Sequence, residues 1–273
     1  MPERTIFFIS DHTGITAETV GHSLLTQFRG IEFDCIALPY VNSVEKAQAA
    51  VDAINHVYAR QGVQPLVFSS LTDRELREKI RQSQAVLFDL FDTFIEPLER
   101  VLQQPSSHAQ GRSHGMGDAA RYDTRIDAVN YVLQSDDGLN LERYREADVI
   151  LTGVSRTGKT PTCVYLGLQF GLHAANYALT DDDLQRPLLP KPLKAHRTKL
   201  YGLTIDVERL QQIREGRRPG SRYASLRQCQ KEVGAAEELF HHENIRYLNT
   251  TTLSIEEIAT TILQELGLKR RIF

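Results

Sequence analysis

Short apolar runs alternate along the first hundred residues with longer segments that carry apolar side chains at helical spacing. The runs have the length of strands, whereas the longer segments have one apolar and one polar face. The predicted strands cover residues 5–10, 31–38, 65–70 and 85–90, and the predicted helices cover 17–28, 43–60 and 72–82. This alternation is typical of a parallel sheet with helices on its faces.

The same alternation returns in the second half of the chain. The predicted strands cover residues 147–152, 174–179, 200–206 and 245–249, and the predicted helices cover 122–133, 161–170, 207–214 and a last segment ending at 266. Ser254 is expected to begin the last helix, because Glu257 three residues later completes a capping box. The second half is therefore also predicted to be α/β.

A polar stretch separates the two halves. Residues 105–117 are rich in Ser, Gly and His, as in a linker, and their His108 and His114 fit a solvated loop better than a metal pair. The predicted fold class is α/β, with an N-terminal parallel-sheet domain over residues 1–104 and a linker and helical connection over 105–145. A second α/β domain is predicted over 146–273.

The most informative motif is a glycine-rich octapeptide between a predicted strand and a predicted helix. Its residues are Gly153, Val154, Ser155, Arg156, Thr157, Gly158, Lys159 and Thr160. Two glycines, a lysine and a hydroxyl residue at this spacing form a loop whose backbone N–H groups can surround phosphate oxygens. Lys159 would then reach the terminal phosphates and Thr160 would bind Mg²⁺. Residues 146–273 are therefore predicted to form a kinase-like, nucleotide-binding domain with a phosphate-binding loop (P-loop). The alternative is a glycine-rich turn without a ligand.

Three acidic positions are candidates for chemistry. Asp136 and Asp137 precede the octapeptide and suit a Mg²⁺ site or a general base, although Asp136-Asp137-Gly138 is also a common turn sequence. Asp206 ends a predicted strand, so it either contacts Mg²⁺ as a Walker B carboxylate or caps the next helix. Asp11 follows the first strand, where α/β sheets bind ligands, and the alternative is that Asp11 or Thr13 caps the following helix.

An arginine cluster lies after residue 213 and has two readings. Its members are Arg214, Arg217, Arg218, Arg222 and Arg227. A solvated helix edge is the ordinary interpretation, and a phosphate clamp or a surface for an acidic partner is the alternative.

Composition narrows the class of protein. The 273 residues carry a net charge of −3, which gives no general attraction to nucleic acid. The three cysteines have neither disulfide-framework nor zinc spacing, so a reducing cytoplasm is expected. The sequence contains no run of about eighteen apolar residues, so no membrane span is expected. A cytoplasmic enzyme fits these features.

Several blocks together resemble the pyruvate, phosphate/water dikinase regulatory proteins. The blocks are Phe8-Ile9-Ser10-Asp11, Ile15-Thr16-Ala17-Glu18, His114-Gly115, Tyr122-Asp123-Thr124-Arg125-Ile126, Asp136-Asp137-Gly138, the octapeptide with Pro161-Thr162, Ala174-Ala175-Asn176-Tyr177, Leu203-Thr204-Ile205-Asp206 and Ser221-Arg222-Tyr223-Ala224-Ser225-Leu226-Arg227. The likeness covers nearly the whole chain. Gly158 favours the branch that acts on phosphoenolpyruvate synthase, since relatives acting on pyruvate, phosphate dikinase tend to carry serine there. His12-Thr13 departs from the family pattern.

The resemblance implies a bifunctional enzyme. It would phosphorylate a threonine of phosphoenolpyruvate synthase with ADP as donor, and remove that phosphate with inorganic phosphate, forming pyrophosphate. Lys159 and the loop amides would hold ADP, Thr160 would hold Mg²⁺, and Asp137 or Asp136 would supply the base or a metal contact. Ser155 and Arg156 would line the entering phosphate, for which Asp11, Thr13 and the arginine cluster are further candidates.

Other interpretations of the motifs stay open at this point. They are the same chemistry on pyruvate, phosphate dikinase, a kinase of a small metabolite, and a nucleotide-gated binding module without chemistry of its own. A homodimer is possible, because enzymes that dock a large partner are often symmetric dimers.

Overall fold

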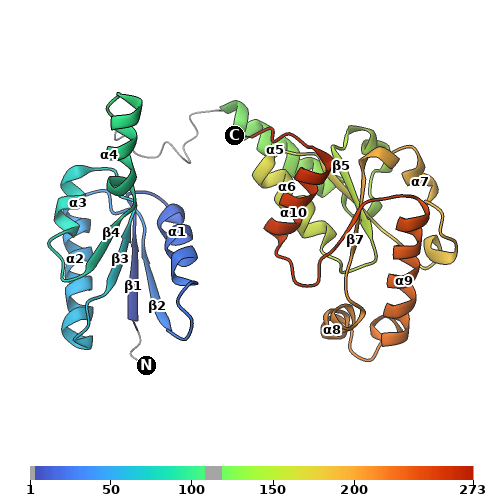
Figure 1. The fold of residues 1–273 in the computed structure, drawn as a ribbon, viewed down its shortest axis with the longest axis horizontal. Helices are drawn as coiled ribbons and strands as arrows, with labels where there is room; N and C mark the ends of the chain where they lie inside the picture. Colours follow the sequence, from blue (N-terminus) through green and yellow to red (C-terminus); the bar gives the residue numbers. More distant parts are fainter. Residues whose placement is uncertain (1–3, 108–118, 273) are drawn as a thin grey trace. The chain divides into compact units, whose positions relative to one another are not determined.

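The structure is a computed structural model that describes residues 4–107 and 119–272. The chain divides into two compact units, Met1–Gly117 and Asp118–Phe273, and each is described by itself. Both units contain a four-stranded parallel sheet with helices on both faces (Figure 1). The predicted α/β fold with two such parts is confirmed.

The first unit is built on a sheet of order β2-β1-β3-β4. Its elements are β1 (Arg4–Ile9), α1 (Ile15–Leu25), β2 (Phe33–Leu38), α2 (Val44–Gln61), β3 (Leu66–Ser69), α3 (Arg74–Ile80), β4 (Val86–Asp89) and α4 (Leu90–Leu102). Alternate side chains of β1 point to opposite faces. Phe7 and Ile9 pack with α2 and α3, whereas Ile6 and Phe8 pack with α1. The continuous apolar run therefore reflects a strand covered on both sides.

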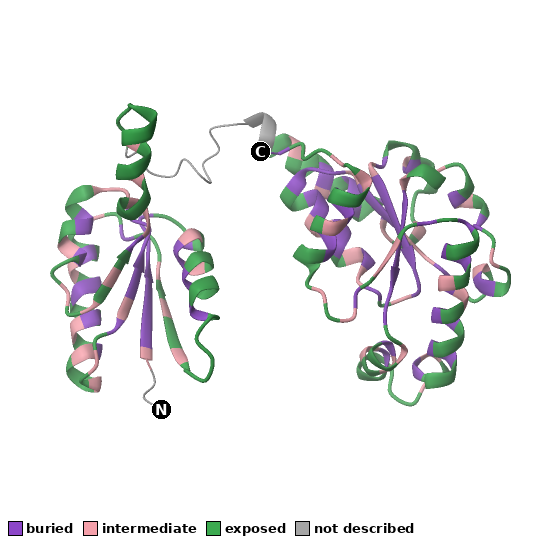
Figure 2. Cartoon of the chain, viewed as in Figure 1, coloured by how far each residue is buried: buried purple, intermediate pink, exposed green. Residues whose placement is uncertain are grey.

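Helix α4 was not predicted from the sequence. It follows β4 without an intervening loop, because Asp89 ends the strand and its carboxylate accepts a hydrogen bond from the Asp92 backbone N–H at 3.0 Å. Pro97 lies inside the helix, and α4 buries no residue (Figure 2). Its apolar residues Phe91, Phe94, Ile95, Leu98 and Leu102 recur at helical spacing, so the sequence contained a helical pattern that the prediction overlooked.

The second unit has the corresponding strand order, β6-β5-β7-β8. Its elements are α5 (Ala119–Gln134), η1 (Asp136–Gly138), η2 (Leu141–Glu146), β5 (Val149–Gly153), α6 (Lys159–Phe170), β6 (Ala174–Ala178), η3 (Asp183–Gln185), α7 (Lys191–Lys194), η4 (Arg197–Lys199), β7 (Leu200–Thr204), α8 (Val207–Arg217), η5 (Arg222–Ala224), α9 (Leu226–His242), β8 (Tyr247–Asn249) and α10 (Ile255–Leu266). Helix α5, within the expected connection, packs against α6 in this unit.

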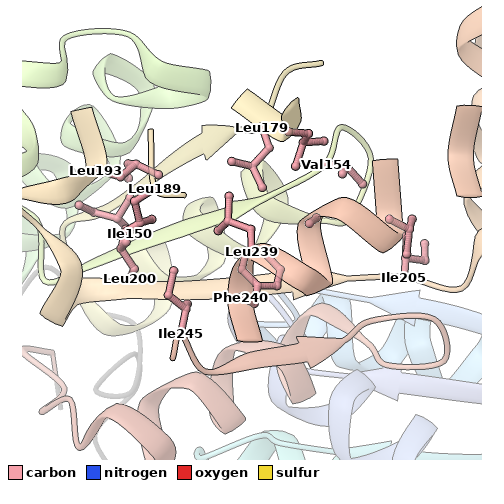
Figure 3. Packing of buried hydrophobic residues seen from close by; sticks show 14 of the residues in the cluster. Ile150, Val154, Leu179, Leu189, Leu193, Leu200, Ile205, Leu239, Phe240 and Ile245 are labelled. Carbon is pink, nitrogen blue, oxygen red and sulfur yellow. The ribbon is translucent and has the colours of Figure 1, made fainter. Parts of the chain in front are cut away.

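Two apolar layers enclose the second sheet. Leu151 and Leu203 pack with α6 and α10 on one face. On the other face, Ile150 packs with Leu239 and Phe240 of α9 (Figure 3). Helix α9 was also missed from the sequence, where its first turns were read only as part of the arginine cluster. Its buried face combines the polar Gln228 and Glu232 with Cys229, Val233, Ala236, Leu239 and Phe240 at helical spacing, so the sequence contained a helical pattern that the prediction overlooked.

Several smaller predictions are confirmed. The capping box of Ser254 and Glu257 begins α10. All three cysteines are free thiols, in agreement with the absence of a disulfide framework. Among the described residues, no helix is both long and apolar enough to cross a membrane.

Candidate functional site

The predicted octapeptide, here called the glycine loop (residues 153–160), connects β5 to α6 as the motif requires. Gly153 has φ 153°, and a Cβ atom there would lie 2.2 Å from the carbonyl oxygen of Leu203. Gly158 has φ 88° at the N-terminus of α6, and Arg156 between them also has a positive φ of 79°. These backbone angles reverse the chain sharply between strand and helix, and the two glycines make that reversal possible.

The loop is held by hydrogen bonds to its own backbone and to neighbouring strands. The Leu179 backbone N–H donates to the Gly153 carbonyl oxygen at 3.0 Å. Thr157 Oγ1 donates to the Val154 carbonyl oxygen at 3.1 Å, and Thr250 Oγ1 donates to the Thr157 carbonyl oxygen at 3.2 Å. The loop conformation is therefore fixed by partners within the second unit.

Arg214 is completely buried and hydrogen-bonds the backbone of the glycine loop. Its Nη2 donates to the Ser155 carbonyl oxygen at 3.1 Å and to Glu232 Oε2 at 2.6 Å. Its guanidinium lies 4.1 Å from the centre of the Tyr223 ring, and the Tyr223 hydroxyl lies 3.0 Å from Ser155 Oγ. Arg214 thus joins the loop to α8 and α9, and Tyr223 joins it to η5.

The arginine cluster predicted from the sequence is therefore divided. Arg214 is a buried support, whereas the other four members are exposed: Arg217, Arg218, Arg222 and Arg227. For Arg214 the solvated-edge interpretation is wrong. The burial of Arg214 could not be predicted from the sequence, because a helix edge rich in arginine usually faces solvent.

The side chain of Lys159 is buried against the backbone of its own loop. Its Nζ donates to the Val154 carbonyl oxygen at 2.9 Å, and only 4% of the residue is exposed. Burial lowers the pKa of Lys159 to about 8, and the nearby Asp137 and Asp136 carboxylates oppose this shift. A bound anion would favour the charged amine, so ligand binding and protonation of Lys159 are coupled.

The acidic turn (Asp136–Gly138, η1) lies beside the first turn of α6. Thr160 Oγ1 donates to Asp136 Oδ1 at 2.8 Å, and Asn176 Nδ2 donates to the same oxygen at 2.6 Å. The Asp137 backbone N–H donates to Asn176 Oδ1 at 3.1 Å. The structure therefore brings together four predicted site residues, Lys159, Thr160, Asp136 and Asp137, and adds Asn176.

Asp206 lies apart from these contacts. Its carboxylate accepts a hydrogen bond from Asn249 Nδ2 at 2.7 Å, and its backbone N–H donates to Thr251 Oγ1 at 2.8 Å. Asp206 occupies the N-cap position of α8, but its side chain makes no capping hydrogen bond. The metal role of Asp206 stays a prediction. Within the described residues, no group of three His, Cys, Asp or Glu side chains could hold a metal by itself.

Asp11 lies in the first unit and is also buried. Its Oδ2 accepts hydrogen bonds from the Thr72 backbone N–H at 3.0 Å and from Thr72 Oγ1 at 2.7 Å. The N-cap of α1 is Gly14, with no side-chain hydrogen bond, so the capping role considered for Asp11 or Thr13 is wrong. A catalytic role of Asp11 stays a prediction, and His108 and His114 lie outside the described residues.

Comparison with known proteins identifies the family. The sequence model described as kinase/pyrophosphorylase matches residues 6–263, which include elements of both units. The chain belongs to this family. The match agrees with the resemblance found in the sequence, and it gives the glycine loop and the acidic turn a context of phosphoryl transfer.

Similar proteins extend over the full length of the chain. A protein of Alkalilimnicola ehrlichii is 58% identical over 270 residues, which cover 99% of this chain and 98% of the relative. A protein of Halorhodospira halophila is 54% identical, with 98% of each chain covered, and one of Legionella pneumophila is 49% identical, with 99% and 100% covered. All three carry the name "Putative phosphoenolpyruvate synthase regulatory protein". Membership of the family supports a kinase or phosphotransferase role for this chain.

Proposed function

We propose that this protein is a bifunctional regulator of phosphoenolpyruvate synthase, a serine/threonine kinase that uses ADP and a phosphorylase that uses inorganic phosphate. The observation that carries the proposal is the cluster of Lys159, Thr160 and the acidic turn around the glycine loop, in a chain of the kinase/pyrophosphorylase family. The names of the full-length relatives support the choice of target.

In the kinase direction, the loop amides and Lys159 hold the phosphates of ADP. Lys159 exchanges its hydrogen bond to the Val154 carbonyl oxygen for a phosphate oxygen. The hydroxyl oxygen of the target threonine attacks the β-phosphorus, the bond to the AMP oxygen breaks, and the hydroxyl proton passes to a carboxylate of the acidic turn. AMP and phosphothreonine are the products, and the target is switched off.

In the other direction, an oxygen of inorganic phosphate attacks the phosphorus of phosphothreonine. The bond to the threonine oxygen breaks, the threonine recovers a proton, and pyrophosphate leaves. Both reactions develop negative charge on a transferring phosphoryl group, so a single set of cations can stabilise both transition states. Ser155 and Arg156 would line the entering phosphate.

Mg²⁺ is part of the proposal. Thr160 would hold it together with phosphate oxygens and water, which suits a cation that usually keeps several waters and few protein ligands. When bound, Mg²⁺ would neutralise charge on the phosphates. We place the reaction in the cytoplasm, in keeping with the three free thiols.

The test is the intact mass of phosphoenolpyruvate synthase after incubation with this protein, Mg²⁺ and pyruvate, with ADP and ATP compared. We expect a gain of one phosphoryl group with ADP, its loss when inorganic phosphate is added, and the appearance of pyrophosphate. Tandem mass spectrometry would then place the phosphate on a threonine.

Other outcomes would select another function. Phosphate transfer to pyruvate, phosphate dikinase alone would keep the chemistry and change the target. Labelled phosphate that appears on a metabolite would indicate a small-molecule kinase. Stoichiometric inhibition without a change of mass would indicate a binding module.

A further inference from the structure

Thr160 and Asp136 are joined in a way that bears on how a cation would be held. The Thr160 hydroxyl has one proton, and it donates that proton to Asp136 Oδ1 at 2.8 Å. The lone pairs of Thr160 Oγ1 are then free to face a cation. A carboxylate that accepts the proton of a metal-binding group orients the group and makes it a better ligand.

Asn176 fixes the position of this carboxylate. It is completely buried in β6, where it pairs with Leu151 of β5, and its Nδ2 donates to Asp136 Oδ1 at 2.6 Å. Its Oδ1 accepts from the Asp137 backbone N–H at 3.1 Å. Because one side of the amide faces an acceptor and the other faces a donor, only one orientation of the side chain satisfies both.

The two acids of the turn consequently differ. Asp136 is partly buried and one of its oxygens accepts two hydrogen bonds. Asp137 is exposed, has the left-handed backbone angles φ 44° and ψ 40°, and within the described chain its carboxylate accepts no hydrogen bond. The Asp137 carboxylate is therefore available to contact an incoming hydroxyl group, whereas Asp136 is held against Thr160.

We infer that Asp136, oriented by Asn176, is the carboxylate that holds Thr160 for Mg²⁺, and that Asp137 is the base. This division of roles rests on the proposed function. It gives Asp136 the part for which the sequence suggested Asp206, whose carboxylate instead contacts Asn249. Asn176 is a positioning residue that acts through Asp136.

The experiment uses Mn²⁺ as the probe, titrated by electron paramagnetic resonance into the full chain with saturating ADP. We compare wild type, Asp136→Asn, Asn176→Ala and Asp137→Asn, and measure ADP affinity without metal as the control. Loss of a carboxylate that orients a metal ligand typically weakens metal binding about 10–100-fold. We expect this loss for Asp136→Asn and Asn176→Ala, with metal-free ADP affinity unchanged.

Asp137→Asn is the matched variant one residue away. It should keep the Mn²⁺ affinity of wild type within about twofold while phosphorylation of the target is lost, since general-base catalysis is typically worth about 10²–10⁴-fold. A kcat measured at saturating Mg²⁺ should recover partly in Asn176→Ala and not in Asp137→Asn. A merely structural role of Asn176 would not produce this dependence on metal concentration.

The outcomes separate the inference from the proposed function. Wild-type Mn²⁺ affinity in Asp136→Asn, or a loss of Mn²⁺ binding in Asp137→Asn, would overturn the division of roles even if the kinase reaction is confirmed. Failure of the wild-type protein to bind ADP would overturn the proposed function and the inference together.

Discussion

The two units have the same sheet topology, but the loops that follow their first strands differ in their side chains. In each, the first strand is central, the second strand lies on one side and the third on the other, so both have a switch point beside the first strand. The loop after that strand leads into a helix whose N-cap is a left-handed glycine without a side-chain cap, Gly14 at φ 83° and Gly158 at φ 88°. The backbone plan of the two loops is thus closely similar.

Their side chains are opposite in charge. In the first unit, Asp11 is tied by two hydrogen bonds to Thr72 at the start of the α3 region. In the second, Lys159 is tied by one hydrogen bond to the carbonyl oxygen of Val154 in its own loop. A carboxylate that accepts two hydrogen bonds from another loop is suited to holding the unit together, whereas a buried amine that donates to a neutral carbonyl oxygen of its own loop can exchange that acceptor for an anion. The topology places a loop, and its side chains decide what the loop binds.

The largest expected effect is a loss of phosphorylation activity when the lysine of the second unit's loop is replaced. Lys159→Met should lower phosphorylation of the target by about 10³-fold, because a preorganised cation at a transferring phosphoryl group is lost. In the wild type, kcat/KM for ADP should fall above pH about 8, where the free enzyme loses the Lys159 proton. Phosphorylation rates with purified target across pH measure both.

Lys46→Met is the control for this variant. Lys46 donates from Nζ to the Tyr40 carbonyl oxygen at 3.0 Å in the first unit, so its loss should leave the rate unchanged. If Lys159→Met retained wild-type activity, the contrast between the loops would have no functional meaning.

A smaller effect is expected when Asp11 is replaced, and it should be a loss of stability of the first unit. Asp11→Ala removes the acceptor of two hydrogen bonds and leaves the Thr72 donors without it, which should cost about 1–3 kcal/mol of the free energy of unfolding of the first unit. ADP affinity should stay within twofold. Urea unfolding and nucleotide titration measure the two quantities.

Asp34→Ala is a matched change at an exposed acid of β2 and should alter stability by less than about 0.5 kcal/mol. Should Asp11→Ala keep its stability but lose phosphate-dependent dephosphorylation, Asp11 would be the catalytic residue that the sequence suggested, and the contrast drawn above would be broken.

The smallest effect tests the backbone plan itself. Gly14→Ala and Gly158→Ala should each cost about 1–2 kcal/mol, because both positions have a positive φ. Neither added Cβ meets an atom closer than 3.7 Å. If both variants lose a similar free energy of unfolding and only Gly158→Ala loses ADP affinity, the two loops share a backbone conformation but not a ligand. If the losses of stability differ, the two loops are less similar than their backbone angles suggest.

Much of the fold could be predicted because strands that are buried on both faces have continuous apolar sequences. The residues of β1 and β5 are apolar on both faces, since helices cover both sides of each sheet. Helix α4 was missed although its apolar residues recur at helical spacing, because it follows a strand directly and Asp89 both ends that strand and caps the helix. In α9, the buried Glu232 pairs with Arg214, and no local pattern reveals a partner eighteen residues away.

The candidate site was also only partly predictable from the sequence. The spacing of Gly153, Gly158 and Lys159 was enough to place the glycine loop, because that geometry is local. The contact between Asp136 and Thr160 spans 24 residues and depends on Asn176 in β6, so it needed the fold. The sequence offered Asp136 or Asp137 as the base or a metal contact, and Asp206 as a metal contact or a helix cap. Their hydrogen bonds distinguish the three acids.

The separation of the apolar clusters has a consequence for how the chain is made. Each cluster takes its residues from one unit only, the first unit contributing none beyond Leu90 and the second none before Tyr131. A ribosome releases the N-terminal half first, and domains generally fold as units during synthesis. The sheet that carries Asp11 can therefore be complete before the nascent chain contains Lys159.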